Sequence, residues 1–152
     1  MIEKLDFTMQ NIIELSSIEK VCFGKDAWSI AALRGEFDHD YSHFFAEKGS
    51  DGKILGYICV RAMFEEAQVC NIAVLPEYRR KGIATRLIYK MIEFVEDQEC
   101  LRCELEVNTM NEPAIAVYKK CGFEEVGVRK NFYRRNRYAS RDAYTMVLEL
   151  NK

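Results

Sequence analysis

A short basic stretch, Arg79-Arg-Lys-Gly82-Ile-Ala84, lies between an apolar segment and the most regularly periodic helical segment of the chain. Gly82 allows a tight backbone turn and the close approach of a ligand. The first turn of a helix offers unpaired N–H groups and a partial positive charge. These features predict a site for a phosphate or pyrophosphate group. A basic surface turn that opens an ordinary helix explains the same residues equally well.

This stretch differs from the two common nucleotide-binding loops. It lacks the G-x-x-x-x-G-K-[ST] pattern of a P-loop, and it lacks the G-x-G-x-x-G pattern that binds dinucleotides. The predicted anion site therefore belongs to another class of ligand-binding turn.

Two carboxylates, Glu104 and Glu106, share one face of an alternating segment whose other face is apolar, formed by Leu101, Cys103, Leu105 and Val107. This alternation predicts a half-buried strand. A carboxylate in a cleft can act as a general base, and one on an exposed strand face is only a solvated charge. The alternation alone does not distinguish the two residues.

Cysteine and histidine offer little support for a metal site. The chain has 6 cysteines, namely Cys22, Cys59, Cys70, Cys100, Cys103 and Cys121. Most of them stand among apolar residues, as expected of buried reduced thiols. The single C-x-x-C pair has no second pair or matching histidines. His39 and His43 are four residues apart without a firm third ligand. We expect no metal.

Strands and helices must position these residues. Ile12, Leu15, Val21 and Cys22 place apolar side chains on one side of the first expected helix. Strands are expected over 2–7, 42–47, 54–62, 68–74, 101–107, 123–129 and 144–150, and helices after the caps Thr8 and Ser29, from Ile83, and after the cap Asn111. The mixture predicts an α/β (mixed α+β) fold with sizeable antiparallel content.

Composition bounds the class of protein. The 152 residues suit a single domain over 1–152, long enough to bury a full core without a metal or disulfide. With 22 basic and 24 acidic side chains, the chain has a formal charge of -2, which excludes a strongly basic nucleic-acid coat. The sequence shows no signal segment and no apolar run long enough to span a bilayer, so we expect a cytoplasmic protein that binds neither DNA nor membrane.

The motifs, in this order, resemble the GCN5-related N-acetyltransferase (GNAT) family. Arg79-x-x-Gly82-x-Ala84 matches its Q/R-x-x-G-x-G/A signature, and Asn71-Ile-Ala-Val74 precedes it as in the family. The resemblance extends through Leu105-Glu-Val107, Asn111, Ala116-Val-Tyr118 and Gly122-Phe123. The spacing and the ending, Arg129 to Tyr133 and then Asp142-Ala143, are most similar to the ribosomal-protein alanine N-acetyltransferase (RimI-like) branch.

The resemblance implies acetyl-CoA as cosubstrate and a mainly antiparallel mixed sheet flanked by helices. The sheet would splay at the acetyl-CoA site, where the strand that follows Val74 parts from its neighbour. An amide near Val74 would polarise the thioester carbonyl, as in an oxyanion hole. The residues implied in cofactor binding are Ile72, Ala73, Val74, Arg79, Arg80, Lys81, Gly82, Ile83, Ala84, Thr85 and Asn111. Asn111 can also be a simple helix cap.

The same resemblance assigns catalytic roles. Glu106 would accept the proton that a protonated amine must lose before it attacks. Tyr118 would protonate the departing thiolate, and its alternative is a helix aromatic that contacts the cofactor. Trp28 and Tyr133 would contact the substrate, although core packing explains Trp28 equally well, and Ala27 stands where this branch often has proline.

The expected activity is direct acetyl transfer, in a ternary complex, to the α-amine of a protein N-terminus, such as that of a ribosomal protein. The alternatives are acetylation of a lysine side chain, a polyamine or another small amine, and a non-catalytic acyl-CoA-binding or ribosome-associated module. A basic run near the C-terminus is either a solvated loop or a steering surface for an acidic partner or ribosomal RNA: Arg129, Lys130, Arg134, Arg135, Arg137 and Arg141. The oligomeric state is left open.

Overall fold

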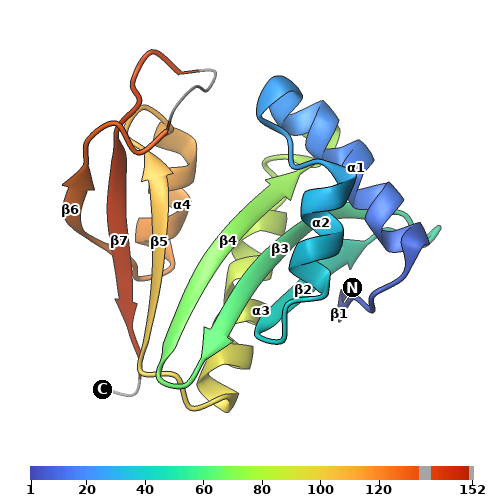
Figure 1. Cartoon of the computed structure of the whole chain (residues 1–152), viewed down its shortest axis with the longest axis horizontal. Helices are drawn as coiled ribbons and strands as arrows, with labels where there is room; N and C mark the ends of the chain where they lie inside the picture. Colours follow the sequence, from blue (N-terminus) through green and yellow to red (C-terminus); the bar gives the residue numbers. More distant parts are fainter. Residues whose placement is uncertain (134–137, 151–152) are drawn as a thin grey trace.

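The computed structural model describes residues 1–133 and 138–150 of the 152-residue chain. Its seven strands form one sheet in the order β1-β2-β3-β4-β5-β7-β6 (Figure 1). The strands are β1 (Ile2–Lys4), β2 (Ser42–Lys48), β3 (Ile54–Met63), β4 (Glu66–Val74), β5 (Arg102–Asn108), β6 (Glu124–Arg129) and β7 (Ala143–Glu149). The helices are α1 (Met9–Phe23), α2 (Ile30–Phe37), α3 (Ile83–Asp97) and α4 (Glu112–Lys120), with 3₁₀ turns at Gly24–Asp26 and Pro76–Tyr78.

The sheet splits between β4 and β5, its one parallel pair among the described strands. Glu66, Ala67 and Gln68 pair with Arg102, Cys103 and Glu104, and the two strands pair no further. Beyond that point they diverge, as Figure 1 shows. All other described pairings are antiparallel. The expected mainly antiparallel sheet, splayed where the strand after Val74 leaves its neighbour, is confirmed.

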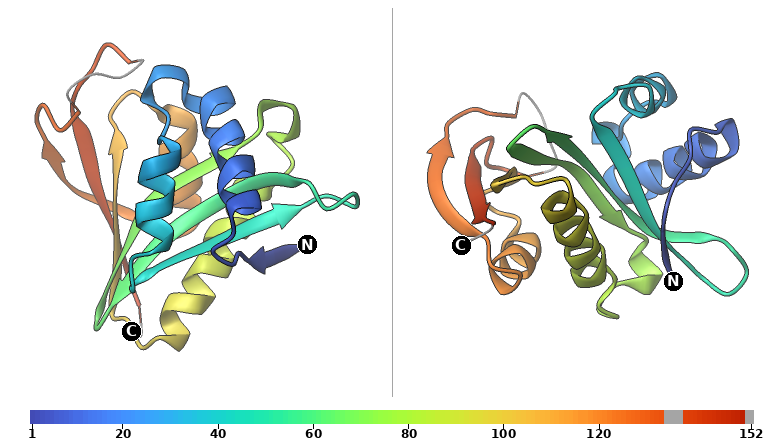
Figure 2. Two further views of the ribbon diagram at one scale, coloured as in Figure 1. Left: turned by 45° about the vertical axis from the view of Figure 1, so that its right-hand side comes forward. Right: turned by 90° about the horizontal axis from the view of Figure 1, so that it is seen from below.

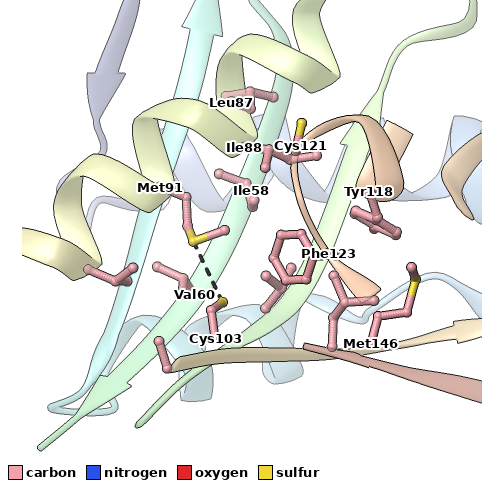
Figure 3. Close-up of a cluster of buried hydrophobic side chains, with 14 of the residues drawn as sticks. Ile58, Val60, Leu87, Ile88, Met91, Cys103, Tyr118, Cys121, Phe123 and Met146 are labelled. Carbon is pink, nitrogen blue, oxygen red and sulfur yellow. Dashed lines mark hydrogen bonds between the residues drawn. The ribbon is translucent and has the colours of Figure 1, made fainter. Parts of the chain in front are cut away.

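Helices cover both faces of the sheet. Helices α1 and α2 pack on one face, and α3 and α4 pack on the other (Figure 2). The α3/α4 face holds a large apolar cluster that includes Met91, Cys103 and Phe123 (Figure 3). The α1/α2 face holds a second cluster around Leu15, Leu33 and Tyr57. The splayed strands are therefore held between two packed layers.

Helix α3 shows how the sequence specifies its element. Its buried residues recur every three to four positions, which builds one apolar face: Ile83, Leu87, Ile88, Met91 and Val95. The predicted caps are also confirmed. The side chains of Thr8, Ser29 and Asn111 accept hydrogen bonds from first-turn N–H groups of α1, α2 and α4.

A β-bulge interrupts the pairing of β3 with β4. Cys59 pairs with Asn71 and Val60 pairs with Val69, so Cys70 is an extra residue on β4. Both Cys70 and the following Asn71 contact groups on the α1/α2 face. The alternation of side chains between the two faces of β4 is therefore broken at Cys70.

Two expected apolar contacts are wrong. Val21 is 58% exposed, and the buried stripe of α1 runs instead through Ile12, Leu15, Ile18 and Cys22, because the helix turns Val21 away from the sheet. Leu101 is 45% exposed because it precedes β5 rather than belonging to it. Within the described residues, no helix is long and apolar enough to cross a membrane.

Candidate active site

A cleft of about 680 Å³ occupies the gap where β4 and β5 separate. Its walls come from α1, the segment after α1, β4, β5, α4 and the segment that follows β6. Six residues expected from the sequence line it: Trp28, Ile72, Glu106, Asn111, Tyr118 and Tyr133. The fold thus brings together residues that are up to 105 positions apart, from Trp28 to Tyr133.

Glu106 lies in the cleft, and Glu104 does not. The Glu106 side chain is only 6% exposed and has Arg129 Nε at 3.9 Å from its Oε2 atom. Thr145 Oγ1 donates a hydrogen bond of 3.1 Å to the same oxygen. Glu104 lines a separate hollow, where its carboxylate lies 3.6 Å from Arg102. Glu104 and Glu106 lie on the same face of β5. Only Glu106 reaches the gap, because β4 still pairs with β5 at Glu104.

Two tyrosines stand near this carboxylate. Burial raises the pKa of Tyr118, on α4, well above its usual range, and the Tyr133 side chain adds to the effect. Burial and the charge of Glu106 raise the pKa of Tyr133 to about 12. Figure 3 shows Tyr118 beside the apolar cluster, where its ring meets Phe123 edge-on at 5.9 Å. Both phenols are therefore protonated, and able to donate, at neutral pH.

The end of β4 directs one backbone amide into the gap. Leu75 N–H donates to the Leu55 carbonyl on β3. Hydrogen bonding alternates along an antiparallel pair, so the N–H of Val74, opposite Gly56, faces away from β3. Strand β5 does not pair with β4 here. The Val74 N–H is therefore a fixed dipole on the open side of β4, whereas Ala73 directs its N–H toward β3.

The basic turn leads directly into the N-terminus of α3. Gly82 is the N-cap of α3 with φ 80°, and it has no side chain that could accept a hydrogen bond from the first-turn amides. Arg79 Nε donates to the Val74 carbonyl at 2.9 Å. Arg86 donates to the Lys81 carbonyl and to both carboxylate oxygens of Glu47. The turn is thus tied both to β4 and to β2.

Asn111 both caps α4 and lines the cleft. Its Oδ1 accepts a hydrogen bond of 3.4 Å from Ala114 N–H and so caps α4. The same residue lines the cleft. The helix-cap interpretation and the ligand-contact interpretation of the sequence are therefore compatible.

Sequence reasoning missed a buried polar network behind Trp28. Glu19 is fully buried, and its carboxylate accepts hydrogen bonds from Trp28 N–H at 2.8 Å, Tyr57 Oη at 2.6 Å and Asn71 Nδ2 at 2.7 Å. Burial raises the pKa of Glu19. A usable signal was present, because Glu19 lies four residues after Leu15 on the apolar stripe of α1.

The basic run near the C-terminus is only partly described. Arg134, Arg135 and Arg137 lie outside the described residues. Arg129 stacks over the Phe132 ring at 5.6 Å. Arg141 Nε donates to the Tyr133 carbonyl at 2.9 Å, which fixes the backbone of a cleft residue.

The histidine and cysteine pairs named in the sequence have separate partners. His43 packs on Phe94, whereas His39 accepts a hydrogen bond from Tyr41 N–H. Cys100 contacts the Phe64 carbonyl, and Cys103 contacts Met91 Sδ. Five of the six cysteines are buried as expected, but Cys70 is half-buried and lines the cleft. Its expected core position is wrong because the bulge displaces it.

Comparison with known proteins identifies the family of this chain. The acetyltransferase (GNAT) family model matches residues 10–123. The N-alpha-acetyltransferase RimI of Mycobacterium tuberculosis is 33% identical over 127 residues, which cover 81% of this chain and 76% of that protein. The [ribosomal protein bS18]-alanine N-acetyltransferase of Escherichia coli K12 is 31% identical over 106 residues, 70% of each chain.

Solved structures agree. The crystal structure of the ribosomal-protein-S18-alanine N-acetyltransferase from Escherichia coli superposes with a TM-score of 0.88 at 26% identity, over 100% of this chain and 96% of that one. The superposition covers the whole of this chain, its seven-strand sheet included. The chain belongs to the GNAT family and is an N-acetyltransferase that uses acetyl-CoA as its cosubstrate.

Proposed function

We propose that this enzyme acetylates the α-amine of a protein N-terminus, with the N-terminal alanine of a ribosomal protein as the model acceptor. The observation that carries the proposal is the cleft between β4 and β5, which combines the Glu106 carboxylate with aromatic side chains from two chain-distant segments. Relatives at about one-third identity carry the name of this activity, which supports the same acceptor class.

Glu106 is the proposed general base. An α-amine is mostly protonated at neutral pH and must lose a proton before it can attack a carbonyl carbon. The Glu106 carboxylate lies in the cleft and accepts a hydrogen bond from Thr145, which orients it. It would take the proton directly or through one water.

Tyr118 is the proposed general acid for the departing thiolate. The thioester of acetyl-CoA supplies the carbonyl that the amine attacks, and its sulfur leaves as the new amide forms. Burial keeps the Tyr118 phenol protonated, so it can give its proton to the sulfur. The Val74 N–H would bind the carbonyl oxygen as negative charge develops there. Direct transfer in a ternary complex needs no acyl-enzyme.

The cofactor would extend from the end of β4 to the start of α3. The backbone of Ile72, Ala73 and Val74 would lie beside its pantetheine arm, and Asn111 would contact the arm from α4. The pyrophosphate would bind at the α3 N-terminus, where the amides carry a partial positive charge. The residues proposed there are Arg79, Arg80, Lys81, Gly82, Ile83, Ala84 and Thr85.

Trp28 and Tyr133 would position the acceptor chain. Both line the cleft, and each backbone is held by a side chain: Trp28 N–H by Glu19, and the Tyr133 carbonyl by Arg141. Two rigid aromatic walls suit an extended peptide whose amine reaches Glu106. A lysine side chain or a polyamine would use less of these walls.

An acceptor panel tests the proposal. Acetyl transfer is measured onto peptides beginning with Ala, Ser or Met, and onto free lysine and spermidine. We expect kcat/KM to be highest for an N-terminal peptide. The matched control is the same peptide with its N-terminus blocked and an internal lysine added, which should not react. Preference for that control, for lysine or for spermidine would contradict the N-terminal assignment.

A further inference from the structure

Two thiols face each other across the bulge between β3 and β4. Cys59 is fully buried, and Cys70 is half-buried in the wall of the cleft. Their sulfur atoms and a carboxylate oxygen of Glu36 all lie within 4.8 Å of one another. The bulge produces this arrangement, because the extra residue of β4 turns toward the side that already holds Cys59.

The neighbouring carboxylate is already committed to other partners. Arg61 donates to both oxygens of Glu36, at 2.7 and 2.8 Å, and Ser42 also donates to one of them. A cation bound by this trio would have to displace at least part of that pairing. The available chemistry of the cluster is therefore that of the two thiols.

The two thiols differ in acidity and exposure, as the attacking and the resolving cysteine of a redox pair do. A hydrogen bond from the Cys59 thiol lowers the pKa of Cys70, with a smaller contribution from Arg61 and opposing contributions from burial and Glu36. Burial raises the pKa of Cys59. A partly exposed thiol with a lowered pKa beside a second cysteine is the arrangement that oxidants select.

We propose that Cys70 and Cys59 form an oxidisable dithiol in the wall of the cleft, with a hydroperoxide as the oxidant. The Cys70 thiolate attacks the peroxide O–O bond, which breaks to give a sulfenic acid and, after protonation, water or an alcohol. The Cys59 sulfur then attacks the Cys70 sulfur. A disulfide forms, and the sulfenic oxygen leaves as water with the Cys59 proton. One peroxide is reduced for each dithiol oxidised.

The chain contains its own control pair. Cys100 and Cys103 are close in sequence, but burial raises the pKa of Cys103 to about 12 and also raises that of Cys100. Cys103 faces Met91 inside the α3/α4 cluster, as Figure 3 shows. Proximity in sequence thus favours the Cys100–Cys103 pair, whereas the exposure and acidity of the Cys70 thiol favour the Cys59–Cys70 pair.

Two measurements on the full-length protein test the proposal. First, the unmodified chain is treated at pH 7 with limiting iodoacetamide and mapped by mass spectrometry. We expect Cys70 to be alkylated at least about tenfold faster than any other cysteine. This measurement needs no variant, so it does not depend on whether a substitution folds.

Second, the chain is treated with one equivalent of hydrogen peroxide. We expect a loss of two hydrogens in the intact mass and a peptide that joins Cys59 to Cys70, both reversed by dithiothreitol. Cys70→Ser should abolish this product, Cys59→Ser should leave a dimedone-reactive sulfenic acid at Cys70, and Cys103→Ser should leave the product unchanged. A Cys100–Cys103 link formed as fast, or Cys70 alkylation no faster than that of the other thiols, would overturn the proposal.

Discussion

Two of the carboxylates that line the cleft, Glu19 on α1 and Glu106 on β5, have different surroundings. Glu19 accepts hydrogen bonds from three donors on three different segments, namely Trp28 N–H, Tyr57 Oη and Asn71 Nδ2. Within the described part of the chain, Glu106 accepts one, from Thr145. A carboxylate whose oxygens are filled holds a structure together, and one with free lone pairs can accept a proton.

The difference follows from the elements that carry them. Glu19 lies on the buried stripe of a helix packed against β3 and β4, so donors of the protein surround it. Glu106 lies on the strand that leaves β4, so its free side faces the gap. We therefore expect Glu19 to support stability and Glu106 to support turnover, and the substitutions below separate these roles.

The largest expected effect is on turnover. Glu106→Gln keeps the size of the side chain and removes its ability to accept the amine proton. We expect kcat to fall by about 10²–10⁴-fold, the usual contribution of a general base, with acetyl-CoA affinity little changed. Steady-state kinetics and calorimetry measure the two quantities. Glu104→Gln is the matched control and should retain turnover; a dead Glu104 variant would reverse the assignment.

The next effect is on folding. Glu19→Ala leaves three donors without their acceptor, and we expect the free energy of unfolding to fall by about 3 kcal/mol in urea titrations. Glu14→Ala is the control, because Glu14 accepts one hydrogen bond, from Ile54 N–H, and its loss should cost about 1 kcal/mol. If the Glu19→Ala protein folded but lost as much turnover as Glu106→Gln, the assignment of Glu19 to stability and Glu106 to turnover would be wrong.

Glu106 and Glu19 also show how much of the site can be predicted from the sequence. Alternation along 101–107 predicted the face of Glu106, and the family motifs distinguished it from Glu104. What actually separates the two is where β5 leaves β4, a long-range pairing that no local pattern encodes. Glu19 was missed because its helix was interpreted from apolar residues alone, although a charged residue on that stripe implies buried donors.

Cys70 shows a second limit. Apolar neighbours predicted a core position, and they are correct for the other five cysteines. A bulge depends on how two strands align, and it shifted Cys70 by one residue into the cleft wall. Fold class, caps and most strands could be predicted, because periodicity and capping are local properties.

A third substitution weakens cofactor binding and leaves both Glu19 and Glu106 unchanged. Gly82→Asp places a negative charge at the α3 N-terminus, in a backbone conformation of φ 80° that disfavours side chains. We expect acetyl-CoA to bind at least about tenfold more weakly, equivalent to ~1.4 kcal/mol, by calorimetry.

Gly82→Asn is the matched control for that change. Asparagine tolerates the left-handed conformation and has nearly the size of aspartate, but it carries no charge. It should weaken binding less than Gly82→Asp. Equal losses in both variants would mean that space beside Arg86, 3.1 Å from an added Cβ, matters rather than charge.

The smallest expected effect is the pH dependence of the stability that Glu19 contributes. Burial raises the pKa of Glu19 above its ordinary value of 4.5 in spite of the three hydrogen bonds that lower it. A group whose pKa is higher in the folded state contributes stability that is fully present below its unfolded pKa and is lost as the pH rises through the folded pKa. The contribution of Glu19 should therefore decrease from about pH 4 upward.

Glu19→Gln isolates this contribution, because it removes one titration and leaves the others in place. The free energy of unfolding of the unmodified protein minus that of the variant should decrease as the pH rises from about 4. Its slope cannot exceed ~1.4 kcal/mol per pH unit, since one proton is involved. A difference that instead grew with pH would show that Trp28, Tyr57 and Asn71 stabilise the Glu19 anion more than burial disfavours it.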